Sequence, residues 1–425
     1  MLRMTDVLVT MALFGIAALG SYLGSSQLNP KVIQAPSVWF EADTGRVYNN
    51  MTERGGTHYR TKVHPLFSIA TAPLVYALQK VGIDKDVAVR GLIAFTAGVA
   101  LVVFFCTLRI LNFPIFDSTV FSVLTGVSAS AMFFSTIPET FLFGGTTILA
   151  VLMFTAISER RSFSSSFYIG ISALSLSMTV TNWMAGIAST LANHSPQRTV
   201  RITIDAFVVV TVLWAVQHAI FPTAEFFLFS AEERHYVFDK NAGGVLEKST
   251  VFFLHSVVMP EFRVSENLWT DDWPSLSVQH SSINFDSPLK LAITTSWILT
   301  LAFGLLGMWK DPNHRKFKVV IAAILGGQFV LHMVYGDETF LYSLHWTPLL
   351  IMVAAFGLTL PYRKWIVALT FVSLFGVGYN NFYQFNRAAS LTWSDSWSAS
   401  PQLVQPTSWD YSKEGVLEEA TLRNK

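Results

Sequence analysis

Long apolar runs separated by short polar connections dominate the chain. Runs of about 20 residues, the length that a membrane-spanning helix needs, occur at 6–24, 88–110, 116–136, 140–158, 201–221, 290–309, 317–335, 339–358 and 364–383. They are continuous, unlike the alternating segments of about ten residues that are typical of a membrane β-barrel. The pattern therefore predicts an all-α polytopic membrane protein.

Positive charge in the short connections predicts how these helices are oriented. Connections rich in Lys and Arg tend to be cytoplasmic, and here they occur at 158–162, 194–201, 309–318 and 361–364. Because the first two must share a side, the stretch between them should cross twice, as 165–181 and 182–193. Counting crossings back from these connections places both ends of 64–82 outside, which predicts a juxtamembrane or re-entrant helix there. About eleven spans result, with the N-terminus inside.

Residues 1–383 are then a single polytopic domain, followed by a short outer tail at 384–425. The main outer loops, 25–87 and 222–288, mix acidic residues, histidines and aromatic residues, whereas the inner connections are short and basic. This asymmetry predicts that the functional face is the outer one. Compact loops and the absence of a retention signal favour a bacterial inner membrane, with that face periplasmic.

Composition supports a membrane protein and excludes other classes. Hydrophobic residues make up 52% of the chain and charged residues 13%, about half of the ~25% charged residues found in soluble domains. The net charge of +1 gives no reason to expect a nucleic-acid partner. A single cysteine, Cys106, excludes an internal disulfide framework.

The first outer loop carries the main candidate chemistry. Glu41 and Asp43 stand two residues apart, soon after the first apolar run. Such carboxylates can act as a general base on a hydroxyl or as ligands of a divalent cation. Solvated loop carboxylates are the alternative interpretation.

Basic residues follow the acid pair closely and strengthen the functional interpretation. Cations beside carboxylates are typical of a site for a phosphate-bearing ligand at a membrane surface, where Arg grips phosphate bidentately and Lys acts as a point charge. The candidates for binding such a substrate are Arg46, Arg54, His58, Arg60, Lys62 and His64.

Three motifs resemble those of the GT-C superfamily of integral-membrane glycosyltransferases. The first loop of that family has an acidic motif and then a segment like Lys62-Val-His64-Pro65-Leu66-Phe67, which opens a juxtamembrane helix. The second outer loop resembles the family at Ile137-Pro138-Glu139-Thr140-Phe141, and a helix ends in Thr181-Asn182. The resemblance covers roughly the first 220 residues.

The resemblance implies a reaction and a set of roles. It implies inverting transfer of a sugar from a polyprenyl-phosphate donor in the membrane lipid to a glycan or lipid-linked acceptor. Asp43 is the implied base, Glu41 its partner or a metal ligand, and Glu139 a second acid in the same site. Arg60, Lys62 and Lys85 are implied to hold the lipid phosphate. A divalent cation at Glu41 and Asp43 is possible.

Other candidates lie further along the chain. Asp337 and Glu338 follow the run at 317–335, where an ionisable residue at membrane depth is a functional hypothesis, although acids also favour the first turn of a helix beginning at Thr339. Asp271-Asp272 between two tryptophans resembles a sugar contact, and His255 is best interpreted as part of an interfacial helix.

Two other functions remain as alternatives. A secondary transporter should have ionisable residues near span centres and two matching halves, and neither is found. A membrane acyltransferase needs a histidine deep in a span; His218 and His332 come nearest, but both lie near the ends of their runs.

Overall fold

The computed structural model describes residues 4–33, 35–228, 236–238, 242–265, 267, 273–283, 285 and 287–393. The fold is mostly helical, with one short antiparallel pair of strands. The α-helices are α1 (Met4–Gln27), α2 (Thr44–Thr52), α3 (Phe67–Lys80), α4 (Lys85–Ile110), α5 (Ile115–Gly126), α6 (Ala129–Phe134), α7 (Thr140–Ser158), α8 (Ser165–Met178), α9 (Trp183–Leu191), α10 (Pro196–Ile220), α11 (Val245–Thr250), α12 (Pro288–Lys310), α13 (Arg315–Val334), α14 (Thr347–Ala355) and α15 (Arg363–Leu391).

Shorter elements join these helices. The 3-10 helices are η1 (Pro30–Ile33), η2 (Tyr59–Lys62), η3 (Val180–Asn182), η7 (Thr339–His345) and η8 (Phe356–Thr359), and η6 (Val251–His255) is a π-helix. Strand β1 (Arg263–Ser265) pairs with β2 (Ser275–Ser277) in the register Val264 opposite Leu276.

Seven of the described helices are long and apolar enough to cross a membrane: α1, α4, α7, α10, α12, α13 and α15. The pair formed by η7 and α14–η8 passes the same test but is bent by 53°, which allows up to eight spans. Each of these helices overlaps a run expected from the sequence, and α7 covers 140–158 as predicted. The multi-pass helical character is therefore confirmed.

The count of eleven spans is not confirmed, because one expected run is interrupted and two expected segments are too short to cross. The run 116–136 divides into α5 and α6, where the Ser128 hydroxyl accepts from the Ala131 N–H and starts a new helix, as serine at an N-cap favours. The run 165–193 divides in two as expected, but α8 has only 14 residues and α9 nine. At 1.5 Å per residue, 14 residues cover about 21 Å of the ~30 Å hydrocarbon core.

Helices α8 and α9 form a tight antiparallel hairpin. Trp183 Nε1 donates to Ser172 Oγ at 3.0 Å, and Gly186 faces Ser172 so closely that a Cβ there would lie 2.5 Å from its Cα. Arg198 Nη2 bonds Ser165 Oγ at 2.7 Å. The connections at 158–162 and 194–201 therefore lie at the same end of the molecule, as the charge pattern predicts.

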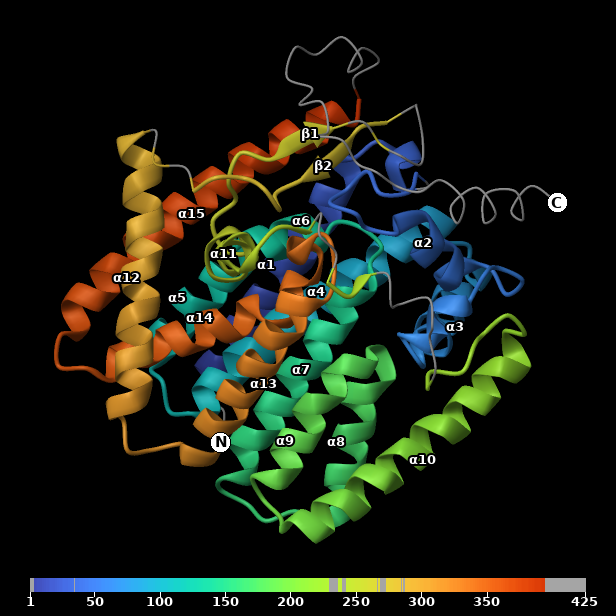
Figure 1. The fold of residues 1–425 in the computed structure, drawn as a ribbon, viewed down its shortest axis with the longest axis horizontal. Coiled ribbons are helices and arrows are strands. Elements are labelled where there is room, and N and C mark those ends of the chain that lie inside the picture. Colours follow the sequence, from blue (N-terminus) through green and yellow to red (C-terminus); the bar gives the residue numbers. More distant parts are fainter. Residues whose placement is uncertain are drawn as a thin grey trace.

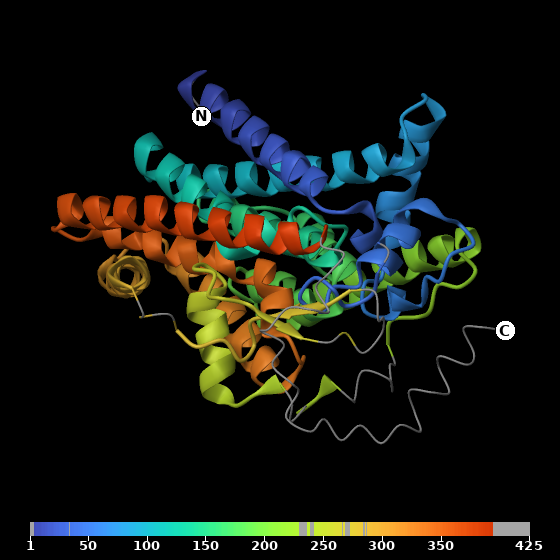
Figure 2. The ribbon, with the colours of Figure 1, turned by 90° about the horizontal axis from the view of Figure 1, so that it is seen from above.

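The segment 64–82 contains α3, which packs against α2 and α4. Its re-entrant placement in the outer leaflet stays a prediction. Helix α1 packs along α4, and both approach the elements of the first loop, α2 and α3 (Figure 2).

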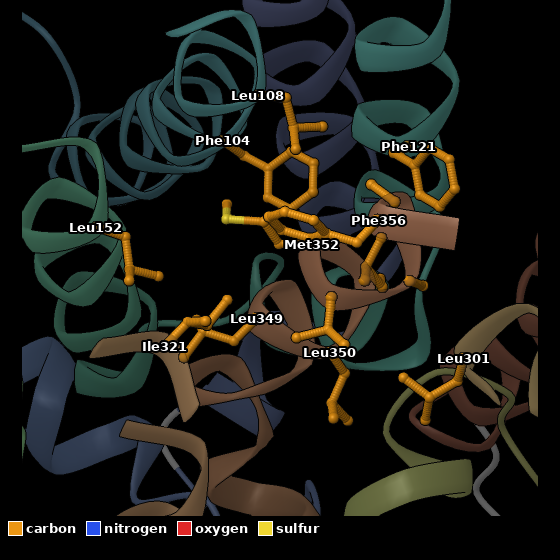
Figure 3. Packing of buried hydrophobic residues seen from close by; sticks show 14 of the residues in the cluster. Phe104, Leu108, Phe121, Leu152, Leu301, Ile321, Leu349, Leu350, Met352 and Phe356 are labelled. Carbon is orange, nitrogen blue, oxygen red and sulfur yellow. The ribbon is translucent and has the colours of Figure 1, made fainter. Parts of the chain in front are cut away.

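The largest core surrounds α14, in which every residue is buried. Figure 3 shows Leu349, Leu350 and Met352 of this helix beside side chains from α4, α5, α7, α12 and α13, among them Phe104 and Leu152. A helix that is apolar all round belongs at the centre of a bundle. The bent pair is thus the axis around which the longer helices pack.

The connections separate into two ends of the molecule. The turns between α7 and α8, α9 and α10, α12 and α13, and η8 and α15 lie toward the lower and left side of Figure 1. The strands, α2 and α3 lie toward the upper and right side. Residues 394–425 and the pair Asp271-Asp272 lie outside the described residues, and α15 continues to Leu391, into the region expected as tail.

Candidate functional site

An aromatic anchor positions the acid pair of the first loop. The Phe40 ring is fully buried and contacts the rings of Phe133, Phe134, Phe262 and Phe340 at centroid distances of 5.3–6.3 Å. Phe40 and Glu41 both have positive φ, 50° and 59°, a conformation that is costly for residues with a side chain. Burial of the aromatic ring thus holds the backbone in a strained turn that fixes where the Glu41 side chain begins.

Glu41 lies against the strand β2 and the segment after α13. Its Oε1 accepts a hydrogen bond from Ser275 Oγ at 3.2 Å. Burial raises the pKa of Glu41 to about 7, and the negative charge of Asp337 adds to this effect. A carboxyl group with this pKa exchanges its proton near neutral pH.

Asp43 precedes α2 and is held by a residue of that helix. Arg46 Nη2 and Nε lie 2.8 and 3.1 Å from Asp43 Oδ2. The Asp43 side chain is 46% exposed, whereas that of Arg46 is 14% exposed. Asp43 therefore presents an oriented carboxylate that is accessible to solvent.

Glu139 caps the start of α7 and joins the first-loop acids. Its Oε1 accepts from the Thr140 N–H at 2.6 Å and contacts Thr140 Oγ1 at 2.8 Å. Burial raises the pKa of Glu139; the charge of Arg46 opposes this shift and that of Asp43 adds to it. The second predicted acid thus lies within electrostatic range of Asp43, 96 residues earlier in the chain.

Asp337 and Glu338 approach the same place from the connection after α13. Glu338 is buried, and its Oε2 accepts from Ser277 Oγ at 2.5 Å. Burial raises the pKa of Glu338 to about 8, with further contributions from the charges of Glu41 and Asp337. Five carboxyl groups from three segments therefore form an acid cluster: Glu41, Asp43, Glu139, Asp337 and Glu338.

His64 is buried next to this acid cluster. Its Nδ1 lies 2.8 Å from the Met178 carbonyl oxygen and its Nε2 3.1 Å from Thr140 Oγ1. Burial holds the pKa of His64 well below its usual range, and the positive charges of Arg60 and Arg46 lower it further. Both arginines thus act on this site.

The remaining cations divide between the cluster and its surroundings. Lys62 is buried with its Nζ 4.8 Å from the centre of the Tyr59 ring, which Arg46 also contacts at 5.9 Å. Lys85 instead pairs with Glu53 at 3.0 Å and lies over the Tyr48 ring. Lys62 therefore lies near the acid cluster, whereas Lys85 contacts Glu53 and Tyr48 instead.

His58 has a structural environment. Its Nδ1 lies 2.7 Å from Ser68 Oγ and its Nε2 2.9 Å from the Glu53 carbonyl oxygen. The ring also contacts the Phe221 ring in a tilted arrangement, with 4.6 Å between the ring centres. Both nitrogens are thus engaged in holding the first loop to α3.

A buried polar group that includes Asn182 of the Thr181-Asn182 motif lies beneath the cluster. His345 Nε2 lies 3.3 Å from Asn182 Nδ2, and Gln328 Nε2 donates to Asn182 Oδ1 at 3.1 Å. A Cβ at Gly144 would lie 2.6 Å from His345 Nε2 and 2.9 Å from Asn182 Nδ2. The Gly144-Gly145 pair inside an otherwise apolar run was the signal that polar neighbours approach α7 here.

A metal ion finds few ligands in this arrangement. Among the described residues, no three His, Cys, Asp or Glu side chains are grouped so that they could hold one. A divalent cation at Glu41 and Asp43 stays a prediction, and no reaction step is assigned to it.

Neither a protein-family model nor a curated protein matches the chain.

Proposed function

We propose that this chain is an inverting glycosyltransferase that moves a sugar from a polyprenyl-phosphate donor to a hydroxyl group of a glycan or lipid-linked acceptor. The acid cluster carries the proposal: five carboxyl groups meet beside Arg46 and Arg60 at one end of a molecule built of apolar helices. A substrate whose leaving group is anchored in the membrane presents its reacting bond at such an end.

Asp43 is the proposed general base. The acceptor oxygen bonds to the anomeric carbon while the bond from that carbon to the phosphate oxygen breaks. The electron pair of the broken bond leaves with the lipid phosphate, and the acceptor proton passes to Asp43. Its partial exposure and the fixed contact with Arg46 suit a base that must meet an incoming hydroxyl.

Arg46, Arg60 and Lys62 are the proposed groups that stabilise the departing phosphate. Positive charges held in place before the reaction lower the barrier because they need no reorganisation when negative charge develops. Lys85 is engaged with Glu53 and Tyr48, so it contributes less to this proposal than the sequence implied. The periplasmic orientation of this end and the inner membrane as its location remain part of the proposal.

The test uses purified protein in lipid nanodiscs with a panel of polyprenyl-phosphate hexoses and pentoses. Release of the sugar to water, with inversion at the anomeric carbon, reports cleavage without an identified acceptor. Asp43→Asn should reduce this release by ~10²–10⁴-fold, as expected for loss of a general base.

Glu53→Gln is the matched control, because Glu53 is an exposed acid of the same loop that pairs with Lys85. It should leave release of the sugar within about twofold of wild type. An Asp43→Asn variant with full activity would overturn the assignment of the base. Release from no member of the panel would overturn the proposed reaction.

A membrane acyltransferase is the second candidate, and one observation favours it. His345 is fully buried at the bend between η7 and α14, with Nε2 next to Asn182, and a buried histidine is what that alternative requires. Acyl transfer that His345→Gln abolishes and Asp43→Asn leaves intact would select this function instead.

A further inference from the structure

Glu139, Thr140 and His64 form a chain of three side chains in which the hydrogen atoms can be counted. Thr140 Oγ1 lies between two atoms, 2.8 Å from Glu139 Oε1 and 3.1 Å from His64 Nε2. All three residues are buried, with exposures of 1–3%. Thr140 has one hydroxyl hydrogen and can donate it to only one of its two neighbours.

The other side of the imidazole ring decides its tautomer. His64 Nδ1 lies 2.8 Å from the Met178 carbonyl oxygen, which can only accept, so Nδ1 must carry a hydrogen. Thr179 Oγ1 lies 3.3 Å from the same nitrogen and donates its own hydrogen to the Met178 oxygen, so it too can accept from Nδ1. In a neutral ring, Nε2 is then an acceptor facing Thr140.

An ionised Glu139 beside this neutral ring would leave one contact without a hydrogen. The Thr140 hydroxyl would face two acceptors, Glu139 Oε1 and His64 Nε2, with one hydrogen to donate. At the other acceptor, its oxygen lone pairs would face lone pairs in a buried, repulsive contact. One additional proton removes this conflict. It can lie on the carboxyl group, which then donates to Thr140 while Thr140 donates to His64, or on Nε2, with both bonds reversed.

We propose that Glu139, Thr140 and His64 share this proton as one unit, with the proton on the Glu139 carboxyl group, so that Glu139 works in the acid cluster as a neutral group. His64 and Thr140 are the positioning residues that keep it there. The unit has no net charge in either arrangement, which suits a buried site.

The surrounding charges select the carboxyl end for the proton. Arg46 and Arg60 lie near His64, and their positive charges, together with burial, lower the pKa of the ring; His345 acts in the same direction. At Glu139, burial and the charge of Asp43 raise the pKa, against the opposing charge of Arg46. An imidazolium ring would be repelled by two guanidinium groups, whereas a carboxylic acid avoids repulsion by Asp43.

The consequence for the site rests on the proposed function. A donor phosphate that enters beside Asp43 meets a neutral Glu139 in place of a second carboxylate. Donor affinity should therefore fall as pH rises through the point at which Glu139 loses the shared proton. The proton count itself depends on no substrate and can be tested without one.

The test is infrared spectroscopy of the full chain in nanodiscs, with the carboxylic acid carbonyl band followed against pH. The Glu139 contribution is the part of the band that Glu139→Gln removes. We expect that part to be present at pH 7. If Glu139→Gln removes no band intensity at pH 7, the proposal is overturned.

Two substitutions at His64 then test the role of the chain. His64→Leu frees the Thr140 hydroxyl to donate to the carboxylate, so the titration midpoint of Glu139 should move down by about one pH unit. If the His64 ring only filled space, the Glu139 midpoint should instead move up, because Leu at this position would increase the burial of the carboxyl group. His64→Gln keeps an acceptor near the position of Nε2 and should retain the wild-type midpoint.

A second pair of variants covers the case in which His64→Leu does not fold. Thr140→Ser keeps the hydroxyl group and should titrate as wild type, whereas Thr140→Val removes the acceptor of the carboxyl proton and should shift the midpoint. Equal titration midpoints of Glu139 in the Thr140→Ser and Thr140→Val variants would overturn the proposed link through the Thr140 hydroxyl. Failure of sugar release with an intact Glu139 band would overturn the proposed function and leave the shared proton standing.

Discussion

The glutamates and aspartates at the two ends of the molecule lie in different surroundings. At the basic end, acids pair directly with cations: Asp6 with Arg109 at 2.6 Å, Asp117 with Arg363 at 2.6 Å and Glu159 with His314 at 2.9 Å. At the other end Asp43 also pairs with Arg46, but Glu41, Glu139 and Glu338 accept hydrogen bonds from Ser275 Oγ, the Thr140 N–H and Ser277 Oγ.

The pKa shifts follow this difference. Burial opposes ionisation of Glu159, yet hydrogen bonds from His314 and the Phe317 N–H lower its pKa below the ordinary value. In the acid cluster, burial and neighbouring acids raise the pKa values of Glu41 and Glu338 to about 7 and about 8. One end joins helices through ion pairs, and the other holds carboxyl groups poised to exchange protons.

Loss of an ion pair at the basic end should have the largest effect on stability. Arg109→Ala leaves the buried Asp6 carboxylate without its guanidinium, and we expect a loss of about 3–5 kcal/mol in the free energy of unfolding. The double variant Asp6→Leu/Arg109→Leu leaves no buried charge and should recover most of this loss. Denaturant unfolding in detergent measures both. A single variant as stable as wild type would contradict the structural role of this end.

A neutral substitution in the acid cluster should stabilise the protein as pH rises. Between about pH 4.5 and 8 the unfolded Glu338 ionises while the folded group keeps its proton, so the free energy of unfolding falls with rising pH. Glu338→Gln removes this fall and should gain on the order of 4 kcal/mol at pH 8, with no gain at pH 4. Thermal unfolding against pH measures the difference. Parallel pH profiles for the two proteins would show that Glu338 is not held protonated.

Removal of a cluster cation should weaken binding of the donor. Arg60→Gln should cost about 1.5–3 kcal/mol of affinity for a polyprenyl-phosphate sugar, the range for a lost charge-assisted contact. Binding is measured on purified protein with the donor that gives the highest sugar release. Arg198→Gln at the opposite end, where the side chain bonds Ser165, is the control and should bind normally. Equal affinity of the Arg60 variant and wild type would remove Arg60 from the site.

Lys85 should show the smallest effect. Its partner Glu53 is 51% exposed and Lys85 itself 37% exposed, and ion pairs of this kind contribute about 0–1 kcal/mol. Lys85→Gln should therefore leave both stability and donor affinity nearly unchanged. An affinity loss as large as that of Arg60→Gln would return Lys85 to the phosphate site and extend the site across α2.

The sequence predicted the part of the site whose residues are neighbours in the chain, and the rest depends on contacts between distant segments. The charges gathered at 41–64 were visible locally, and Glu139 was found through a resemblance in its neighbouring residues. The structure brings Glu139, Asp337 and Glu338 to Glu41 and Asp43, with Arg46, Arg60 and His64 beside them. Local sequence patterns did not predict that Lys85 pairs with Glu53 or that His58 is enclosed, because both depend on residues elsewhere in the chain.

The sequence by itself determined the long helices and the separation of their connections. Apolar length is a sum over neighbouring residues, so α7 is readable as 140–158, and the basic connections can be recognised one at a time. The basic connections on either side of 165–193 also predicted that this stretch divides in two. Tertiary structure alone decided that Ser128 starts a new helix and that His345 meets Asn182 beside Gly144. It also placed the Thr140 hydroxyl oxygen between Glu139 and a histidine 76 residues earlier in the chain. Hydrogen bonds and burial act between atoms brought together by packing, and their effect on a proton is set by distance in space, which residue order does not specify.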